Sequence, residues 1–284
     1  MRVGLRLLEL ARERRARAIF VVGTGKNVGK TTALLAMYEA AWRSGFRVGL
    51  ASIGPKTGLR LHSNTVFVTA RPLLAPSPAV EILKISDIES SAGSLLYART
   101  AHDGLYDLAG PSSASGLRAA IEHVANRSDI VLIDGAIDRL ATLASGDGAI
   151  VVSCGAAAAK TESEAVCDVA TLTARLRVPL FDSRAAAVEL EGALTATMAA
   201  EFIAAGEERQ IVVGDSTQIV MSGRSLSEAL ARLRVRCRRA LDVIATTVCA
   251  VAPERSFDPG PFLDAVAGAT KLPSFDVFAG REAA

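Results

Sequence analysis

The stretch "AIFVVGTGKNVGKTTALLAM", Ala18 to Met37, decides the fold. It opens with a short apolar run rich in β-branched residues, which is typical of a buried parallel strand. A glycine-rich loop follows, and then a segment with helical periodicity that reaches Gly45, a residue type that often ends helices. The next apolar run, Phe46 to Ser52, completes a strand–helix–strand unit. The sequence therefore predicts an α/β fold with a mostly parallel sheet, in three layers.

The loop between this strand and this helix has the composition of a phosphate-binding loop (P-loop). Gly29, Lys30 and Thr31 match the Gly-Lys-Ser/Thr half of that pattern, whereas Thr24 occupies the place of its first glycine. In such loops backbone N–H groups and the lysine hold phosphates, and the hydroxyl binds Mg²⁺. The residues expected to bind the nucleotide are Gly23, Thr24, Gly25, Lys26, Asn27, Val28, Gly29, Lys30, Thr31 and Thr32.

A carboxylate at the end of a second buried strand would complete this site. Asp134 follows the apolar run Ile130 to Ile133, where it can orient Mg²⁺ or its water shell. A simple Asp-Gly turn at the end of a strand is the plainer alternative. We expect ATP and Mg²⁺ as cofactors, Thr31 and Asp134 as metal ligands, and Lys30, Lys26 and Asp134 as catalytic residues.

The sequence as a whole predicts a division into four segments. They are an N-terminal helix at 1–16, a P-loop nucleotide-binding domain at 17–175 with a β-rich insertion at about 60–110, a C-terminal α/β half at 176–279 packed on the same core, and a tail at 280–284. The basic run Arg232 to Arg239 continues a helical pattern and is expected to be a solvated helix face.

Composition argues against several classes of partner. The net charge is +2 and aromatic residues make up 5%, which makes nucleic acid an improbable ligand. The longest weakly polar run, Gly148 to Ala159, is too short to span a bilayer, and the N-terminus lacks the pattern of a signal peptide. Four separated cysteines fit reduced, mostly buried thiols. We expect a cytoplasmic protein.

The loop resembles those of the dethiobiotin synthetase and MinD-like group of P-loop proteins. Its Gly-Thr-x-x-x-Val-Gly-Lys-Thr frame runs from Gly23 to Thr31. In MinD-like ATPases a second lysine in the loop reaches the nucleotide of the partner subunit. Lys26 lies one residue from that position, so the resemblance implies a homodimer in which Lys26 acts across the interface.

Further segments are similar to a narrower family, the ATPase subunit of the reactivating factor for lysine 5,6-aminomutase. The segments are "GLASIG", "NTVFVTA", "GPSSASGL", "LIDGAIDR" and "TTVCAVAP". The resemblance implies Mg²⁺-dependent ATP binding and slow hydrolysis by a chaperone, or reactivase. Its client would be an adenosylcobalamin-dependent aminomutase, and a second reactivase subunit would be its partner.

Two positions depart from the family pattern. An acidic residue is expected after "GLASIG", where the chain has Pro55 and Lys56, and an asparagine that reads adenine is expected where Cys249 stands. The first departure puts hydrolysis in doubt, and the second puts selectivity for ATP in doubt. Two other functions therefore stay open: an ATP-dependent ligase or small-molecule kinase like dethiobiotin synthetase, and a non-hydrolysing nucleotide-binding module.

Overall fold

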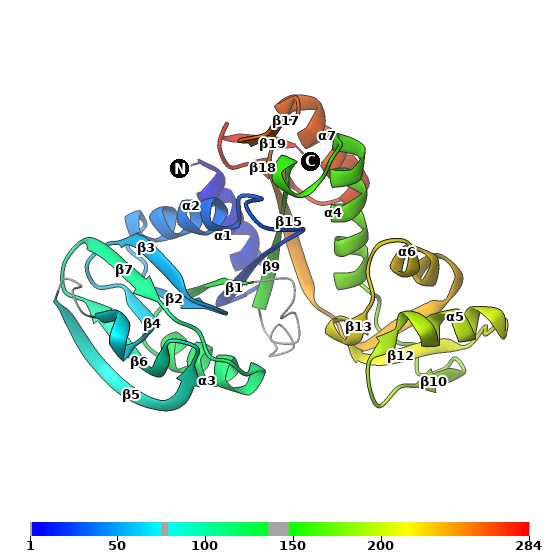
Figure 1. Cartoon of the computed structure of the whole chain (residues 1–284), viewed down its shortest axis with the longest axis horizontal. Coiled ribbons are helices and arrows are strands. Elements are labelled where there is room, and N and C mark those ends of the chain that lie inside the picture. Colours follow the sequence, from blue (N-terminus) through cyan, green and yellow to red (C-terminus); the bar gives the residue numbers. More distant parts are fainter. Residues whose placement is uncertain (1, 75–78, 136–147, 284) are drawn as a thin grey trace.

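The main body of the protein is one extended sheet. A computed structural model describes residues 2–74, 79–135 and 148–283. Within these residues ten strands follow the spatial order β19-β18-β15-β9-β1-β8-β2-β4-β6-β5 (Figure 1). The strands are β1 (Ala18–Gly23), β2 (Val48–Ser52), β4 (Val66–Ala70), β5 (Val80–Ser90), β6 (Gly93–Thr100), β8 (Ile130–Asp134), β9 (Gly148–Gly155), β15 (Asp242–Cys249), β18 (Ser274–Asp276) and β19 (Arg281–Ala283). From β18 to β4 neighbouring strands are parallel, and the outer strands join by antiparallel pairing.

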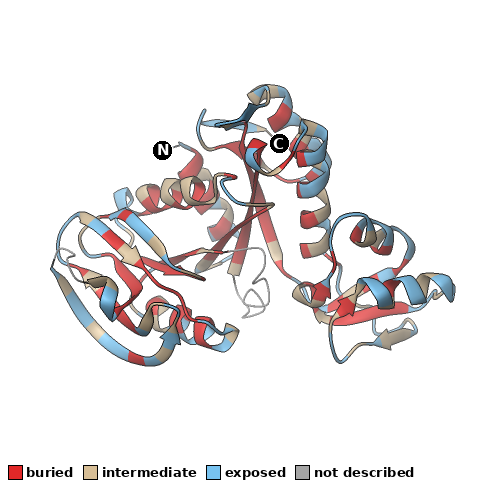
Figure 2. Ribbon diagram, in the orientation of Figure 1, coloured by how far each residue is buried: buried red, intermediate tan, exposed pale blue. Residues whose placement is uncertain are grey.

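Helices cover both faces of this sheet. They are α1 (Arg2–Glu13), α2 (Lys30–Arg43), α3 (Ala114–Ala125), α4 (Glu162–Leu176) and α7 (Pro259–Thr270). Side chains of a strand alternate between its two faces, so in β1 Ile19 and Val21 pack with α1 and α2. Phe20 and Val22 pack with the other three helices. Buried residues follow the central strands and the inner sides of the helices (Figure 2). The predicted three-layer α/β P-loop fold is confirmed.

The strand-rich segment predicted near residues 60–110 consists of strands that extend the main body. Strands β4, β6 and β5 lengthen the sheet itself. Two further strands pair antiparallel with each other: β3 (Lys56–Leu61) and β7 (Gly104–Leu108). Leu61 and Tyr106 of this pair are buried in the same hydrophobic cluster as α1 and α2. One short 3₁₀ turn, Arg71–Leu74, follows β4.

Residues 178–239 form a small lobe beside the main body (Figure 1). Its elements are β10 (Ala187–Glu189), β11 (Leu194–Thr195), α5 (Ala196–Ala204), β12 (Gln210–Asp215), β13 (Ile219–Val220), α6 (Gly223–Arg232) and β14 (Arg234–Arg239). Its fully buried members, such as Ile211 and Cys237, share one cluster that includes no buried side chain of the sheet helices. After the lobe, the chain returns to the main sheet with β15 and β18, and α7 lies between them in sequence. Short pieces complete the chain: 3₁₀ turns at Ala156–Ala158 and Ser216–Gln218, and the pair β16 (Val251–Ala252) and β17 (Arg255–Ser256).

The prediction that Arg232 to Arg239 continues a helix is wrong. Helix α6 ends at Arg232, and Arg234–Arg239 is a strand that pairs in parallel with β12. Val235 and Cys237 are buried, whereas Arg234 and Arg238 are exposed. This alternation of period two suits a half-buried strand, and pairing with β12 outweighs the local helical pattern.

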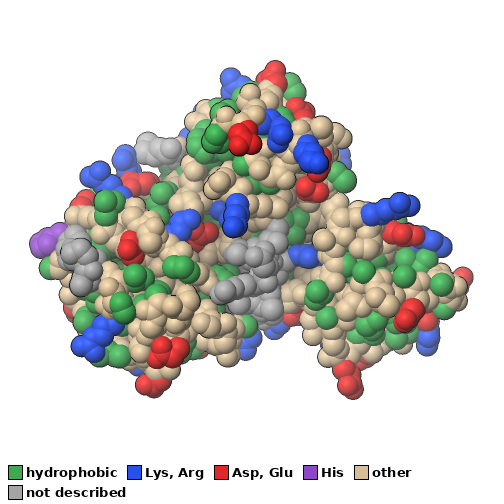
Figure 3. Space-filling model, in the orientation of Figure 1, with side chains coloured by type: hydrophobic (Ala, Val, Ile, Leu, Met, Phe, Trp, Pro, Cys, Tyr) green, Lys and Arg blue, Asp and Glu red, His purple; other side chains and the backbone are tan. Residues whose placement is uncertain are grey.

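The distribution of surface charge and the length of the helices are relevant to binding of nucleic acid and of membranes. On the face drawn in Figure 3, the coloured Lys and Arg side chains are interspersed with Asp and Glu and form no continuous basic surface among the described residues. Throughout 2–74, 79–135 and 148–283, no helix combines the length and the apolar character that a membrane span requires.

Candidate nucleotide-binding site

The predicted P-loop lies between the end of β1 and the start of α2. Gly29, the residue before the helix, has a φ of 88°, in the left-handed region that glycine adopts without strain. Asn27 also has a positive φ, of 57°. Among the described residues no side chain caps this helix. Its first backbone N–H groups and the positive end of its dipole are therefore available to an anion.

The unusual glycine position has a steric cause. A Cβ atom at Gly23 would lie 2.7 Å from Cγ2 of Val28 and 2.8 Å from the carbonyl oxygen of Ser153. The next residue, Thr24, donates its backbone N–H to that same carbonyl over 2.9 Å. The loop thus packs against β9 at Gly23, where a side chain would collide with its neighbours.

The two loop lysines differ in their surroundings. Lys30 is half-buried, and its Nζ donates a hydrogen bond to the carbonyl oxygen of Gly25, so its side chain reaches back across the loop. Lys26 is exposed and makes no hydrogen bond or ion pair with other described residues. Lys30 is therefore positioned to meet a phosphate inside the loop. The trans-acting role that the resemblance implies for Lys26 stays a prediction.

The two predicted metal ligands, Thr31 and Asp134, meet at the carboxyl end of the sheet. Strand β8 lies between β1 and β2, in a register that aligns Asp134 with Val21 and Ser52. Between the two ligands lies the ammonium of Lys56, which is 2.5 Å from Oγ1 of Thr31 and 2.9 Å from Oδ2 of Asp134. The side chains of Lys56 and Asp134 are only 30% and 13% exposed.

This arrangement does not fit a magnesium ion as it stands. Mg²⁺ requires oxygen ligands at about 2.0–2.1 Å in octahedral geometry. The hydroxyl of Thr31 and the carboxylate of Asp134 are suitable donors, but both already bind the Lys56 ammonium, which carries its own positive charge. Elsewhere in the described residues, no group of three or more His, Cys, Asp or Glu side chains could hold a metal.

The other side of the loop is bounded by the ends of β15 and β18. A Cβ atom at Gly29 would lie 3.3 Å from Cβ of Cys249 and 3.6 Å from Cε2 of Phe278. Burial raises the pKa of the Cys249 thiol, and the nearby charge of Asp276 adds to the effect, so the thiol stays protonated and donates to the carbonyl oxygen of Val251. Cys249 therefore lies beside the loop.

Phe278 was not identified from the sequence. Phe278 is 63% exposed and lies in a turn after β18, where Asp276 accepts hydrogen bonds from the backbone N–H groups of Phe278 and Ala279. Nothing in the local pattern distinguishes it from other C-terminal aromatics, because its position beside Gly29 arises from tertiary structure.

A hollow of about 620 Å³ adjoins the loop at Thr24 and is lined mainly by residues of α4 and α6. Burial lowers the pKa of Arg175, whose Nε is buried without a partner among the described residues, and burial together with Glu164 raises the pKa of Asp168. The hollow is lined by Thr24, Cys167, Asp168, Thr171, Leu172, Arg175, Ser222, Gly223, Arg224, Leu226 and Ser227.

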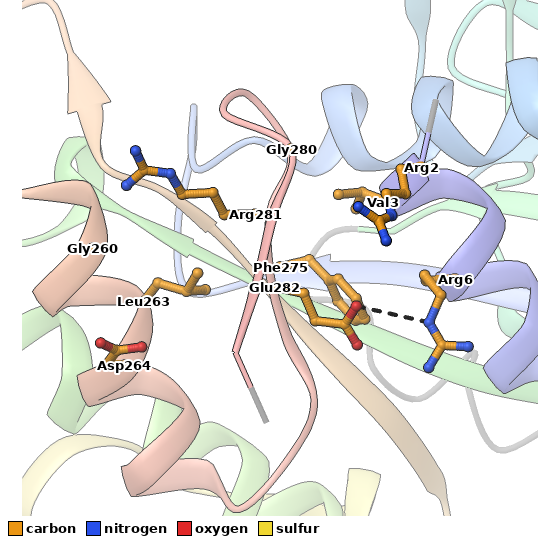
Figure 4. A pocket seen from close by; sticks show the side chains of 10 residues that line it. All are labelled: Arg2, Val3, Arg6, Gly260, Leu263, Asp264, Phe275, Gly280, Arg281 and Glu282. Atoms are coloured by element: carbon orange, nitrogen blue, oxygen red, sulfur yellow. Dashed lines mark ion pairs between the residues drawn. The ribbon is translucent and has the colours of Figure 1, made fainter.

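A smaller hollow, of about 440 Å³, lies away from the loop (Figure 4). It is formed by α1, α7 and the C-terminal strands, and an ion pair of 3.8 Å between Arg6 and Glu282 crosses it. Its charged side chains, which also include Asp264 and Arg281, are of both signs. None of the predicted site residues lines this hollow.

A family model matches the part of the chain that contains the loop. Residues 9–82 match a family model described as "Domain of unknown function (DUF1611_C) P-loop domain", which covers the loop and Lys56. No curated protein matches the chain. Among solved structures, a "BceF Tyrosine Kinase Domain" is similar, with 18% identity over 58% of this chain and 68% of that chain and a TM-score of 0.33. A superposition this loose carries no argument. The chain contains a P-loop domain.

The comparisons and the geometry leave some predictions untested. Residues 136–139, which end the segment "LIDGAIDR", lie outside the described residues. The P-loop domain indicates nucleotide binding, while the particular nucleotide, the client and the second subunit remain predictions.

Proposed function

We propose that this chain binds ATP at the P-loop. The observation that carries the proposal is the open N-terminus of α2, with Lys30 reaching across the loop and Lys56 facing it from β3. Backbone N–H groups and ammonium groups are the donors that bind phosphate oxygens. The exposed ring of Phe278 beside Gly29 offers a face on which a base can stack.

Hydrolysis by the isolated chain is proposed to be slow. Phosphoryl transfer to water requires a group that positions the water molecule, and an acid was expected next to Pro55. Lys56 takes that position and already binds Asp134. Lys30 would stabilise charge on the transferring phosphoryl group. A partner protein is therefore proposed to supply or reposition the missing group.

The resemblance of the sequence supports a narrower proposal about that partner. We propose that the chain acts as the ATPase of a cytoplasmic reactivase for an adenosylcobalamin-dependent aminomutase, with a second subunit and as a homodimer. The test is ATP turnover with and without such an aminomutase. Turnover that the aminomutase leaves unchanged would contradict this narrower proposal while leaving nucleotide binding intact.

The test of nucleotide binding is calorimetric titration with ATP, ADP and GTP, each with Mg²⁺ and with EDTA. Lys30→Met, which keeps the length of the side chain without its charge, is expected to weaken ATP binding by about tenfold or more, since hydrogen bonds to charged groups contribute about 1.5–3 kcal/mol. The matched control is Lys84→Met, which removes the same charge from the exposed strand β5. Equal affinity in wild type and Lys30→Met would refute the site.

The hollow beside Thr24 favours one second candidate, an ATP-dependent ligase or small-molecule kinase. It is large enough for a metabolite and presents both Asp168 and Arg175 next to the loop. An amine could pair with the first of these and a carboxylate with the second. A thermal-shift screen of small amines and carboxylates in the presence of ATP tests this candidate, which fails if no compound raises the melting temperature.

A further inference from the structure

We propose that the ammonium of Lys56 takes the place of the magnesium ion in this site, so that nucleotide binds without a divalent cation. The inference rests on the proposed nucleotide-binding function and specifies which cation serves it. Its basis is the position of one nitrogen atom between the two oxygens that would otherwise hold the metal, 2.5 Å from Thr31 Oγ1 and 2.9 Å from Asp134 Oδ2.

The backbone holds Lys56 in this position. Strand β2 ends at Ser52, and β3 begins at Lys56 after a short turn. The turn is attached to β8, because Ile53 donates its N–H to the carbonyl oxygen of Asp134 over 3.0 Å. It is also pressed against Gly110, where a Cβ atom would lie 1.6 Å from the Ser52 carbonyl oxygen. Lys56 itself pairs with Leu108 of β7.

The contacts of the ammonium suit a phosphate ligand. A lysine ammonium has three N–H donors. Two are used by Thr31 and Asp134, which leaves one without a partner among the described residues. That donor can meet a phosphate oxygen held in the loop, while the hydroxyl and the carboxylate fix the direction of the other two. Thr31 and Asp134 thus position Lys56 instead of a metal.

Charge explains why the lysine and the metal exclude each other. A divalent ion bound to Thr31 and Asp134 would lie next to the positive charge that already binds both side chains. Like charges at such short range repel strongly, most of all where side chains are largely shielded from water. Magnesium could therefore bind only if the Lys56 ammonium moved away. A lysine in place of the expected acid is consistent with a site that does without the metal.

The experiment is calorimetric titration with ATP in EDTA and in excess Mg²⁺, on wild type, Lys56→Met and the control Lys84→Met. Wild type and the control are expected to bind ATP in EDTA about as tightly as in Mg²⁺. Lys56→Met is expected to lose about tenfold or more in EDTA, the effect of one charged hydrogen-bonding group. Because Thr31 and Asp134 are then released, Mg²⁺ is expected to restore its binding.

The possible results separate this inference from the proposed function. If wild type binds ATP only with Mg²⁺, Lys56 yields to the metal, and the inference fails while nucleotide binding stands. If Lys56→Met binds in EDTA as tightly as wild type, the ammonium does not contact the phosphates, and the inference fails as well. If wild type binds no nucleotide in either buffer, both proposals fail. Circular dichroism of each variant checks that Lys56→Met is folded.

Discussion

Gly23 shows how a single residue shapes the loop. A Cβ atom at this position would lie too close to both the side chain of Val28 and the carbonyl oxygen of Ser153. The pattern expected a glycine at 24, and judged by that pattern the loop is deviant. The close approach to β9 explains why glycine is required one residue earlier instead.

We expect Gly23→Ala to lower the free energy of unfolding by about 1–3 kcal/mol, because overpacked methyl groups force backbone shifts of that cost. The matched control is Gly268→Ala, in the exposed interior of α7, where nothing lies within 4 Å of the added methyl. This change is expected to stabilise the protein by about 0.5–1 kcal/mol. Urea unfolding measures both, and effects of the same sign would contradict the steric explanation.

At the level of single residues the sequence predicted part of the site. Lys30, Thr31 and Asp134 could be found because the loop and the strand end are local patterns, each readable within a few residues. The contacts of Lys56 could not be found, since they join the start of β3 to α2 and β8. Only its departure from the expected acid was visible. No pattern in the sequence indicated a role for Phe278.

For helices and strands, too, the sequence predicts features that depend on neighbouring residues better than features that depend on tertiary contacts. The start of α4 can be read from the sequence, because the residue before it, Thr161, caps the helix by accepting a hydrogen bond from the N–H of Glu164. Strand β14 was mistaken for helix because its alternation is short and adjoins α6. A helix cap depends on residues that are neighbours in the sequence. The short parallel strand β14, in contrast, depends on hydrogen bonding to β12, some twenty residues away.

His62, which follows β3, contacts helix α2 and the loop between β6 and β7, and these contacts predict that stability depends on pH. Its ring stacks on Trp42, with centroids 3.9 Å apart, and its nitrogens lie 2.9 Å from carboxylate oxygens of Glu39 and Asp103. Burial alone would lower the pKa of His62, but the hydrogen bonds to Asp103 and Glu39 outweigh it, and the pKa is raised. The charged form is therefore favoured by the folded state.

The sign of the effect follows from this raised pKa. The stabilisation is fully present below the unfolded pKa of about 6.5 and is lost as the pH rises through the higher folded-state pKa. We expect the urea midpoint of wild type to fall over that range and the fall to be smaller in His62→Gln. His102→Gln, at an exposed position in the adjoining loop, is the control. A pH profile that His62→Gln leaves unchanged would contradict the prediction.

For the whole molecule, the separate cluster of residues 178–239 has a consequence for unfolding. The lobe touches the body through few hydrogen bonds, among them Ser216 Oγ to the Leu176 carbonyl oxygen over 3.3 Å and Arg175 Nη1 to the Met221 carbonyl oxygen over 3.4 Å. Its buried side chains pack on one another. Units with separate cores open with separate free energies. We therefore expect the lobe to open while the main sheet stays folded.

We expect matched truncations to separate the two units. Ile211 in β12 and Ile133 in β8 are both fully buried, one in each core, and Ile→Ala costs about 2–5 kcal/mol at such sites. In hydrogen exchange followed by mass spectrometry, Ile211→Ala should speed exchange in β10, β12 and β14 and leave β1, β8 and β9 unchanged. Ile133→Ala should speed exchange in the main sheet. If Ile211→Ala accelerates exchange equally in both sheets, lobe and body open together, and the chain is one cooperative unit in spite of its divided core.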